Sequence, residues 1–137
     1  MTKLSVYFGL NGRCQEAMDF YKNCFGGEPT LTIIGDSPMK DQFPEAMKDK
    51  VLHAELTTDG FTMMASDMNG PDGFTEGTNV AISLDNPNQE KAKQFFDKLA
   101  VGGTIMEDFK PQFWGGMMGV VRDQFGIKWM ISCSVNS

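Results

Sequence analysis

The sequence predicts an α+β fold made of two successive βαβββ modules in a single domain of 137 residues. The first observation is an internal repeat, because AMDFYKNCFGG at 17–27 resembles AKQFFDKLAVGG at 92–103. The second is the order of elements: in each copy a strand-like segment precedes the helix and three strand-like runs follow it. The third is a glycine-rich connector at 68–77, which separates modules at about 1–67 and 78–137.

The first module opens with the strand-like segment KLSVYFGL at 3–10. A helix follows, because apolar side chains recur at helical spacing, and the pair Gly26-Gly27 is a natural stop. Strand-like runs then lie at 29–34, 51–58 and 61–67, and the tripeptide TDG predicts a hairpin between the last two. The helical positions are Cys14, Ala17, Met18, Tyr21 and Phe25.

The second module repeats this order. SVYFGLNGRCQEA of the first copy aligns without a gap with VAISLDNPNQEKA of the second, and Asn86 before Pro87 predicts the start of the second helix. The next strand-like runs are 103–107, 117–122 and 127–134, and the segment RDQFG joins the last two. On the final strand we expect core positions at Trp129, Ile131 and Cys133.

Composition excludes several classes of function. A net charge of −6 with scattered basic residues argues against nucleic acid as a partner. No apolar run approaches the roughly 20 residues that cross a bilayer, and the N-terminal segment lacks the features of a signal peptide. Three cysteines without a C-x-x-C pair predict reduced thiols, so we expect a cytoplasmic protein.

Three segments carry a family resemblance: EAMDFYKNCFGGE at 16–28, HAEL at 53–56 followed by MMASD at 63–67, and FWGGMMGVVRDQFGIKWMIS at 113–132. In this order they resemble the PhnB-like branch of the vicinal-oxygen-chelate superfamily, which includes glyoxalase I, extradiol dioxygenases and bleomycin-resistance proteins. The resemblance implies curved mixed sheets around a cleft, a homodimer, and a divalent metal that chelates two adjacent substrate oxygens. Some related chains are named demethylubiquinone methyltransferase, but this sequence has no G-x-G turn after a strand to hold a nucleotide-like methyl donor.

The resemblance also implies where a metal would bind, with His or Gln on the first strand of a module and Glu on the last. Here KLSVYFGL offers neither, and TNVAISLD has Asn79 near the position where histidine is common. The last strand has Met130 or Ile131 where Glu would be expected, and Asp67 alone could supply an anionic oxygen. The usual four-ligand set is therefore missing, and we expect either no cofactor or a weakly bound divalent metal.

VLHAEL at 51–56 contains the only histidine of the chain. On a strand, His53 and Glu55 project to one face while Leu52, Ala54 and Leu56 face the other. His53 could be a catalytic base oriented by Glu55, or both could form part of a displaced metal site with Asp67. Alternatively, His53 hydrogen-bonds within the sheet and Glu55 is simply solvated.

KPQFWGGMMG at 110–119 is rich in aromatic, glycine and methionine residues. Phe113 and Trp114 could form a wall of a small-molecule pocket together with Met117 and Met63. Equally, Trp114 could close the end of the sheet or lie in a dimer interface, where tryptophan is enriched.

Three functions remain open at this point. We favour a binder of a small molecule in the cleft, with a degenerate metal site, because methionine and aromatic side chains are plentiful. The first alternative is a divalent-metal-dependent lyase, isomerase or dioxygenase that uses His53. The second alternative is a dimeric interaction module without a small-molecule site. The fold alone does not decide among them, since one fold hosts many chemistries.

Overall fold

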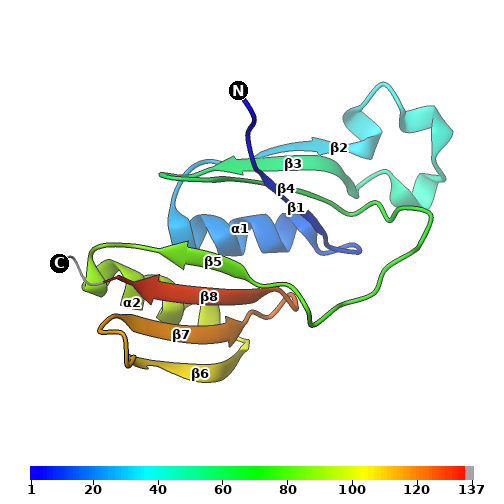
Figure 1. Cartoon of the computed structure of the whole chain (residues 1–137). Helices are drawn as coiled ribbons and strands as arrows, with labels where there is room; N and C mark the ends of the chain where they lie inside the picture. Colours follow the sequence, from blue (N-terminus) through cyan, green and yellow to red (C-terminus); the bar gives the residue numbers. More distant parts are fainter. Residues whose placement is uncertain (135–137) are drawn as a thin grey trace. The chain divides into compact units, whose positions relative to one another are not determined.

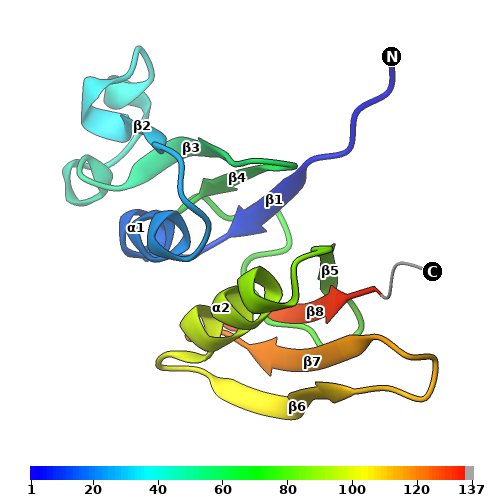
Figure 2. The same cartoon turned by 90° about the vertical axis from the view of Figure 1, so that its left-hand side faces the viewer.

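The computed structural model describes residues 1–134 and divides the chain into two compact units, Met1–Thr75 and Glu76–Ser137. Each unit contains a four-stranded mixed sheet and one helix that runs along a face of its own sheet (Figures 1 and 2). The predicted α+β class and the tandem βαβββ order are both confirmed. Within residues 1–134 we find no helix with the length and apolar character needed to cross a membrane.

Unit 1 places its strands in the spatial order β1-β4-β3-β2. β1 runs parallel to β4, whereas β3 pairs antiparallel with both β4 and β2. Its elements are β1 (Val6–Gly9), α1 (Cys14–Phe25), β2 (Thr30–Ile33), β3 (Val51–Thr57) and β4 (Thr62–Ser66). Three short 3₁₀ turns lie between β2 and β3, at Ile34–Asp36, Lys40–Gln42 and Glu45–Met47.

Unit 2 repeats this topology with the spatial order β5-β8-β7-β6. β5 is parallel to β8, and β7 is antiparallel to both β8 and β6. Its elements are β5 (Ile82–Asp85), α2 (Gln89–Ala100), β6 (Thr104–Pro111), β7 (Met117–Arg122) and β8 (Lys128–Cys133).

The core of unit 1 lies between α1 and the sheet. Ala17, Met18 and Tyr21 recur at helical spacing and are fully buried. The Tyr21 ring packs 5.7 Å from the Phe8 ring of β1, measured between centroids. The helix ends as predicted at Gly26, whose φ of 84° suits a residue without a Cβ atom.

The core of unit 2 confirms the sequence prediction for β8, because Trp129 and Ile131 are fully buried and Cys133 is buried. β7 approaches α2 closely at Gly119. A Cβ atom there would lie 2.6 Å from Phe96 Cε2 and 2.9 Å from the Phe109 Cα atom. Glycine is therefore needed to let the helix approach this strand.

The second helix starts later than the sequence predicts. Asn88, not Asn86, caps it, since the Asn88 side chain accepts a hydrogen bond from the Lys91 backbone N–H. The Asn86 side chain instead accepts from the Asn88 backbone N–H, at 2.9 Å, and so forms a turn before the helix.

The ungapped alignment of the two copies is wrong in the first strand. Leu10 N–H donates to Ser66 O, and the corresponding bond of unit 2 runs from Asn86 N–H to Ser132 O. Leu10 therefore matches Asn86, although the ungapped alignment pairs Leu10 with Asp85. The reason is the connection to the helix, which covers residues 10–13 in unit 1 and only 86–88 in unit 2.

Candidate functional site

The two faces of the unit 1 sheet differ in what covers them. Val6 pairs with Met63, and Phe8 pairs with Ala65, on the face that α1 covers. Because side chains alternate along a strand, their neighbours point to the opposite face, which we call the open face of unit 1. It carries Tyr7, Thr30, Thr32, His53, Glu55 and Met64, which the strand pairing places side by side.

Tyr7 and His53 form an aromatic pair on this open face. Their ring centroids lie 6.2 Å apart with the planes inclined by 36°. Tyr7 is 56% exposed, whereas His53 and Glu55 are half-buried. As the alternation of VLHAEL predicts, His53 and Glu55 share a face, opposite the buried Ala54 and Leu56.

Glu55 gives the open face its charge. Among the residues of β1 to β4 it is the one Asp, Glu, Lys or Arg. Met64 lies between Tyr7 and Glu55 in the strand register and is half-buried. The face therefore combines two aromatic rings, a polarizable thioether and one carboxylate, a set suited to holding a flat organic molecule.

Asp67 has a structural role at the end of β4. Its Oδ1 atom accepts hydrogen bonds from the backbone N–H groups of Gly12 and Cys14, both at 2.8 Å. Its Oδ2 atom accepts from Val51 N–H at 2.9 Å. Both oxygens are thus used to fasten β3 and the start of α1 to β4, a use of a carboxylate at a helix N-terminus that the helix dipole favours.

The Cys14 thiol lies beside this carboxylate and is fully buried. Burial, and the nearby negative charge of Asp67, raise the pKa of Cys14 from 9.0 to about 12. A thiol of this kind stays protonated at neutral pH and is a poor nucleophile. Cys14 therefore belongs to the core and not to a reactive site.

Asp67 also lines a cavity of about 410 Å³ in unit 1. The other lining residues include Lys50 and Met47, which come from the segment between β2 and β3. Because Asp67 already occupies the backbone N–H groups at the start of α1, this end of the helix holds an anion supplied by the protein itself.

The residues do not fit the metal site that the family resemblance implies. Within residues 1–134 there is no group of three or more His, Cys, Asp or Glu side chains that could hold a metal ion, so His53, Glu55 and Asp67 do not come together as a ligand set. Asp85 is a carboxylate on β5, but its Oδ1 atom accepts hydrogen bonds from Ser132 Oγ and from both the backbone N–H and the Oγ of Ser134.

The methionines predicted for the pocket lie on the helix side of their sheets. Met63 is fully buried against α1, and Met117 pairs with Cys133 on the α2 side. Their neighbours Met64 and Met118 point to the faces opposite the helices instead. The choice between adjacent methionines depends on register, since a shift of one residue moves a side chain to the other face. Met64 was missed because its pairing with Glu55 depends on the register of β3 and β4, which the sequence does not show.

Phe113 and Trp114 occupy the turn between β6 and β7. Phe113 is 97% exposed and Trp114 is 54% exposed, and their rings meet edge to face at 5.1 Å. The turn is closed by hydrogen bonds between Gln112 and Gly116 and between Gly115 and Gln112. Within unit 2, then, these rings form an exposed aromatic tip.

Curated relatives share most of the chain with this protein. Protein YjdN of Escherichia coli is 31% identical over 138 residues, which cover 94% of this chain and 93% of that protein. The protein Rv0887c of Mycobacterium tuberculosis is 32% identical over 123 residues, which cover 84% of this chain and 65% of that protein.

Solved structures show the same fold. The protein PA1353 of Pseudomonas aeruginosa superposes with a TM-score of 0.83 at 32% identity, covering 99% of this chain and 100% of that one. A PhnB protein of Bacillus cereus gives a TM-score of 0.74 at 21% identity, covering 97% and 100% of the two chains. A glyoxalase/bleomycin resistance protein/dioxygenase family enzyme of Burkholderia phytofirmans gives 0.63 at 11% identity, covering 96% of each chain.

The sequence model of the 3-demethylubiquinone-9 3-methyltransferase family matches residues 2–132, which is nearly the whole chain. This match agrees with the paired βαβββ units and with the structural neighbours. The chain therefore belongs to the 3-demethylubiquinone-9 3-methyltransferase family, and it shares its fold with a glyoxalase/bleomycin resistance protein/dioxygenase family enzyme.

Proposed function

We propose that this protein binds a small planar aromatic molecule, neutral or cationic, on the open face of unit 1 and without a metal ion between ligand and protein. The observation that carries the proposal is the Tyr7–His53 ring pair, 6.2 Å apart, beside Met64 and Glu55. Aromatic rings and a thioether offer a surface on which a flat ligand stacks.

The charge of the face supports the choice of ligand. Glu55 contributes a carboxylate, and no Lys or Arg lies within β1 to β4 to balance it. A cationic ring system gains from that carboxylate and from the faces of Tyr7 and His53. An aromatic acid would meet repulsion instead, which makes the sign of the ligand charge a test of the site.

The family name denotes methyl transfer, but a name does not establish an activity for a member, since function depends on the residues of the site. The sequence lacks the G-x-G turn after a strand that would hold a nucleotide-like methyl donor. Methyl transfer requires a site for the methyl donor, whereas ligand binding requires only a surface that fits the ligand. The two aromatic rings, the thioether and the carboxylate of the open face support the proposal of binding.

The experiment uses the cationic dye proflavine as a probe and two kinds of signal as readouts. His53 is the only histidine, so its imidazole gives a single-residue signal in NMR spectra. Isotope-labelled methionine methyl groups report Met64 on the open face and Met63 in the core beneath it. We expect proflavine to shift the His53 and Met64 signals and to leave Met63 nearly unchanged.

Variants make the test specific. Tyr7→Ala should weaken proflavine binding about tenfold or more, since it removes the most exposed ring of the face. Phe74→Ala is the matched control, because Phe74 is also exposed, at 40%, but lies outside the strands. If Phe74→Ala weakens binding as much as Tyr7→Ala, or if the His53 signal does not move, the proposal is wrong.

A second candidate is an enzyme that uses His53 as a metal-free general base. It is favoured by the position of His53 and Glu55 on the same face as the proposed ligand surface. The test measures exchange of acidic C–H protons of a bound ligand with deuterated water. His53→Gln should stop this exchange and leave the dissociation constant within about threefold. Equal exchange by the wild type and His53→Gln would exclude this second role.

A further inference from the structure

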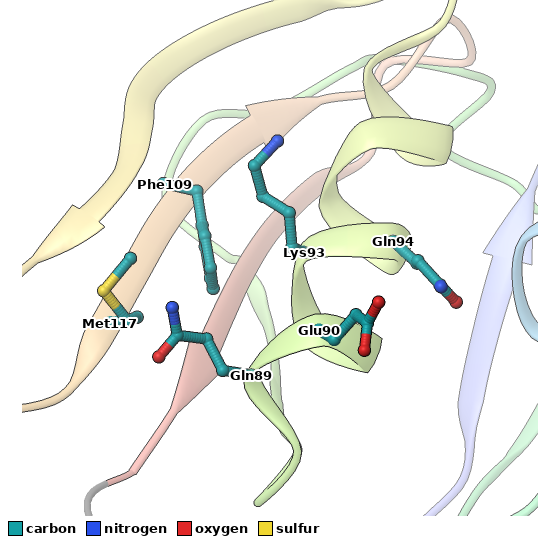
Figure 3. Close-up of a pocket in the computed structure, with 6 residues that line it drawn as sticks. All are labelled: Gln89, Glu90, Lys93, Gln94, Phe109 and Met117. Atoms are coloured by element: carbon teal, nitrogen blue, oxygen red, sulfur yellow. The ribbon is translucent and has the colours of Figure 1, made fainter.

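Unit 2 contains a second cavity, of about 530 Å³, on the helix side of its sheet. Ligand pockets commonly have volumes of about 300–1,000 Å³. Met117 lies on the face of β7 that α2 covers, so this cavity lies between the helix and the sheet of unit 2. The residues that line it are Gln89, Glu90, Lys93, Gln94, Phe109 and Met117 (Figure 3).

The internal repeat explains why the cavity exists. Gln89 and Lys93 of α2 match Cys14 and Met18 of α1, both of which are fully buried. In unit 2 the same two helical positions carry long polar side chains that are exposed. The first turns of α2 therefore lack the apolar groups that fill the space in unit 1, which leaves room beside the half-buried Phe109 and Met117.

The floor of the cavity is apolar. Phe109 is half-buried, and its ring lies 5.7 Å from the ring of Phe96 on α2. β6 is irregular here, because its register with β7 shifts between Glu107 and Lys110. Such bulges redirect a side chain and are common beside functional sites. Here the irregular segment supplies Phe109 to the cavity, next to Met117.

The rim carries one cation, one carboxylate and two amides. Figure 3 shows Gln89 and Lys93 on the side of α2 toward Phe109 and Met117, whereas Glu90 and Gln94 lie on the other side of the helix. Lys93 Nζ pairs with Asp97 Oδ1 at 2.6 Å, but both side chains are about half exposed. Ion pairs of this kind are weak and exchange readily, so a ligand carboxylate can replace Asp97 as the partner of Lys93.

From these observations we infer that the cavity between α2 and the β6–β7 floor is a second ligand site, which takes a planar aromatic carboxylate. The ring stacks on Phe109 and Met117, and the carboxylate accepts hydrogen bonds from Lys93 and Gln89. The site goes beyond the proposed function, since it lies in the other unit, on the other side of a sheet, and favours the opposite ligand charge.

The test uses naphthoate and its neutral analogue naphthamide as probes. We expect naphthoate to shift the methyl signal of Met117 and not that of Met64, and to bind about tenfold more tightly than naphthamide. Proflavine should do the reverse for the two methionines. Failure of the naphthoate result thus leaves the proposed function standing, and failure of the proflavine result leaves this site standing.

Lys93→Met is the decisive variant, because it places in unit 2 the residue that fills the same position in unit 1. It should preserve the fold and weaken naphthoate binding about tenfold or more. Lys91→Met is the matched control, since Lys91 is on the same helix but does not line the cavity, its Nζ atom lying over the Phe95 ring at 5.8 Å. The inference is overturned if the Met117 signal does not respond to naphthoate. Equal affinity for both probes, or equal losses in Lys91→Met and Lys93→Met, would overturn it as well.

Discussion

Asp67→Asn tests the structural role assigned to this carboxylate. Asp67 is 8% exposed, and its two oxygens accept three backbone N–H groups at the end of β4. An asparagine side chain has a single acceptor oxygen, so its NH₂ group must face at least one of these donors. In the better orientation the oxygen keeps Gly12 and Cys14, and the N–H of Val51 loses its partner.

The magnitude follows from the count of hydrogen bonds lost. A charge-assisted hydrogen bond contributes about 1.5–3 kcal/mol, and a buried donor without a partner costs about 1–3 kcal/mol. Asp67→Asn should therefore lower the free energy of unfolding by about 2–3 kcal/mol. Asp67→Ala removes all three acceptor contacts and should cost roughly 3–5 kcal/mol. Native domains have a free energy of unfolding of about 5–15 kcal/mol, so either loss is a large part of the total.

Urea denaturation measures this loss directly. The midpoint should fall in Asp67→Asn while the slope with denaturant stays the same, because the surface exposed on unfolding does not change. Asp59→Asn is the matched control, since Asp59 is an exposed carboxylate in the β3–β4 turn. If Asp67→Asn stays within about 0.5 kcal/mol of the wild type, the hydrogen bonds do not hold these elements together.

Three further changes test other parts of the structure. The wild type should lose stability as the pH rises from 9.0 to about 12, because the folded state keeps the Cys14 thiol protonated where the unfolded chain releases its proton. Cys14→Ala should lack this part of the loss, and parallel pH profiles of the two proteins would contradict this. Gly119→Ala should cost about 1–3 kcal/mol in urea denaturation, since its Cβ atom meets the Phe109 backbone at 2.9 Å, whereas Gly9→Ala, with nothing within 4 Å, should cost far less. Asp123→Asn should destabilise unit 2 by about 2 kcal/mol and shift Trp129 fluorescence, because Asp123 Oδ2 accepts from Trp129 Nε1 at 2.9 Å; an unchanged spectrum and midpoint would refute that role.

The repeat and the alternation of apolar residues were enough to predict the element order. Helical spacing and the Gly-Gly stops located α1, and the hairpin signals located β3, β4, β7 and β8 to within one or two residues. β6 is the exception, since it runs to Pro111 and not to 107. Its residues are almost all exposed and its register is irregular, so it shows no apolar alternation that a sequence could reveal.

The site was harder to predict because it depends on contacts between distant residues. His53 and Glu55 share a face because of their own spacing, but the approach of Tyr7 to His53 depends on the register of β1, β4 and β3. Asp67 resembled a metal ligand in sequence, and only the folded backbone shows its three N–H partners. The expected homodimer, the cytoplasmic location and the absence of a tightly bound cofactor stay predictions.

If the open face of unit 1 binds an organic molecule directly, the NMR signal of His53 reports that binding most simply. The measurement titrates proflavine, and separately Mn²⁺ and Zn²⁺, into the wild type with and without EDTA. We expect a saturable proflavine shift of the His53 signal that EDTA does not change, and no stoichiometric response to either metal. A stoichiometric, EDTA-reversible metal response at His53, or proflavine binding that requires the metal, would contradict it.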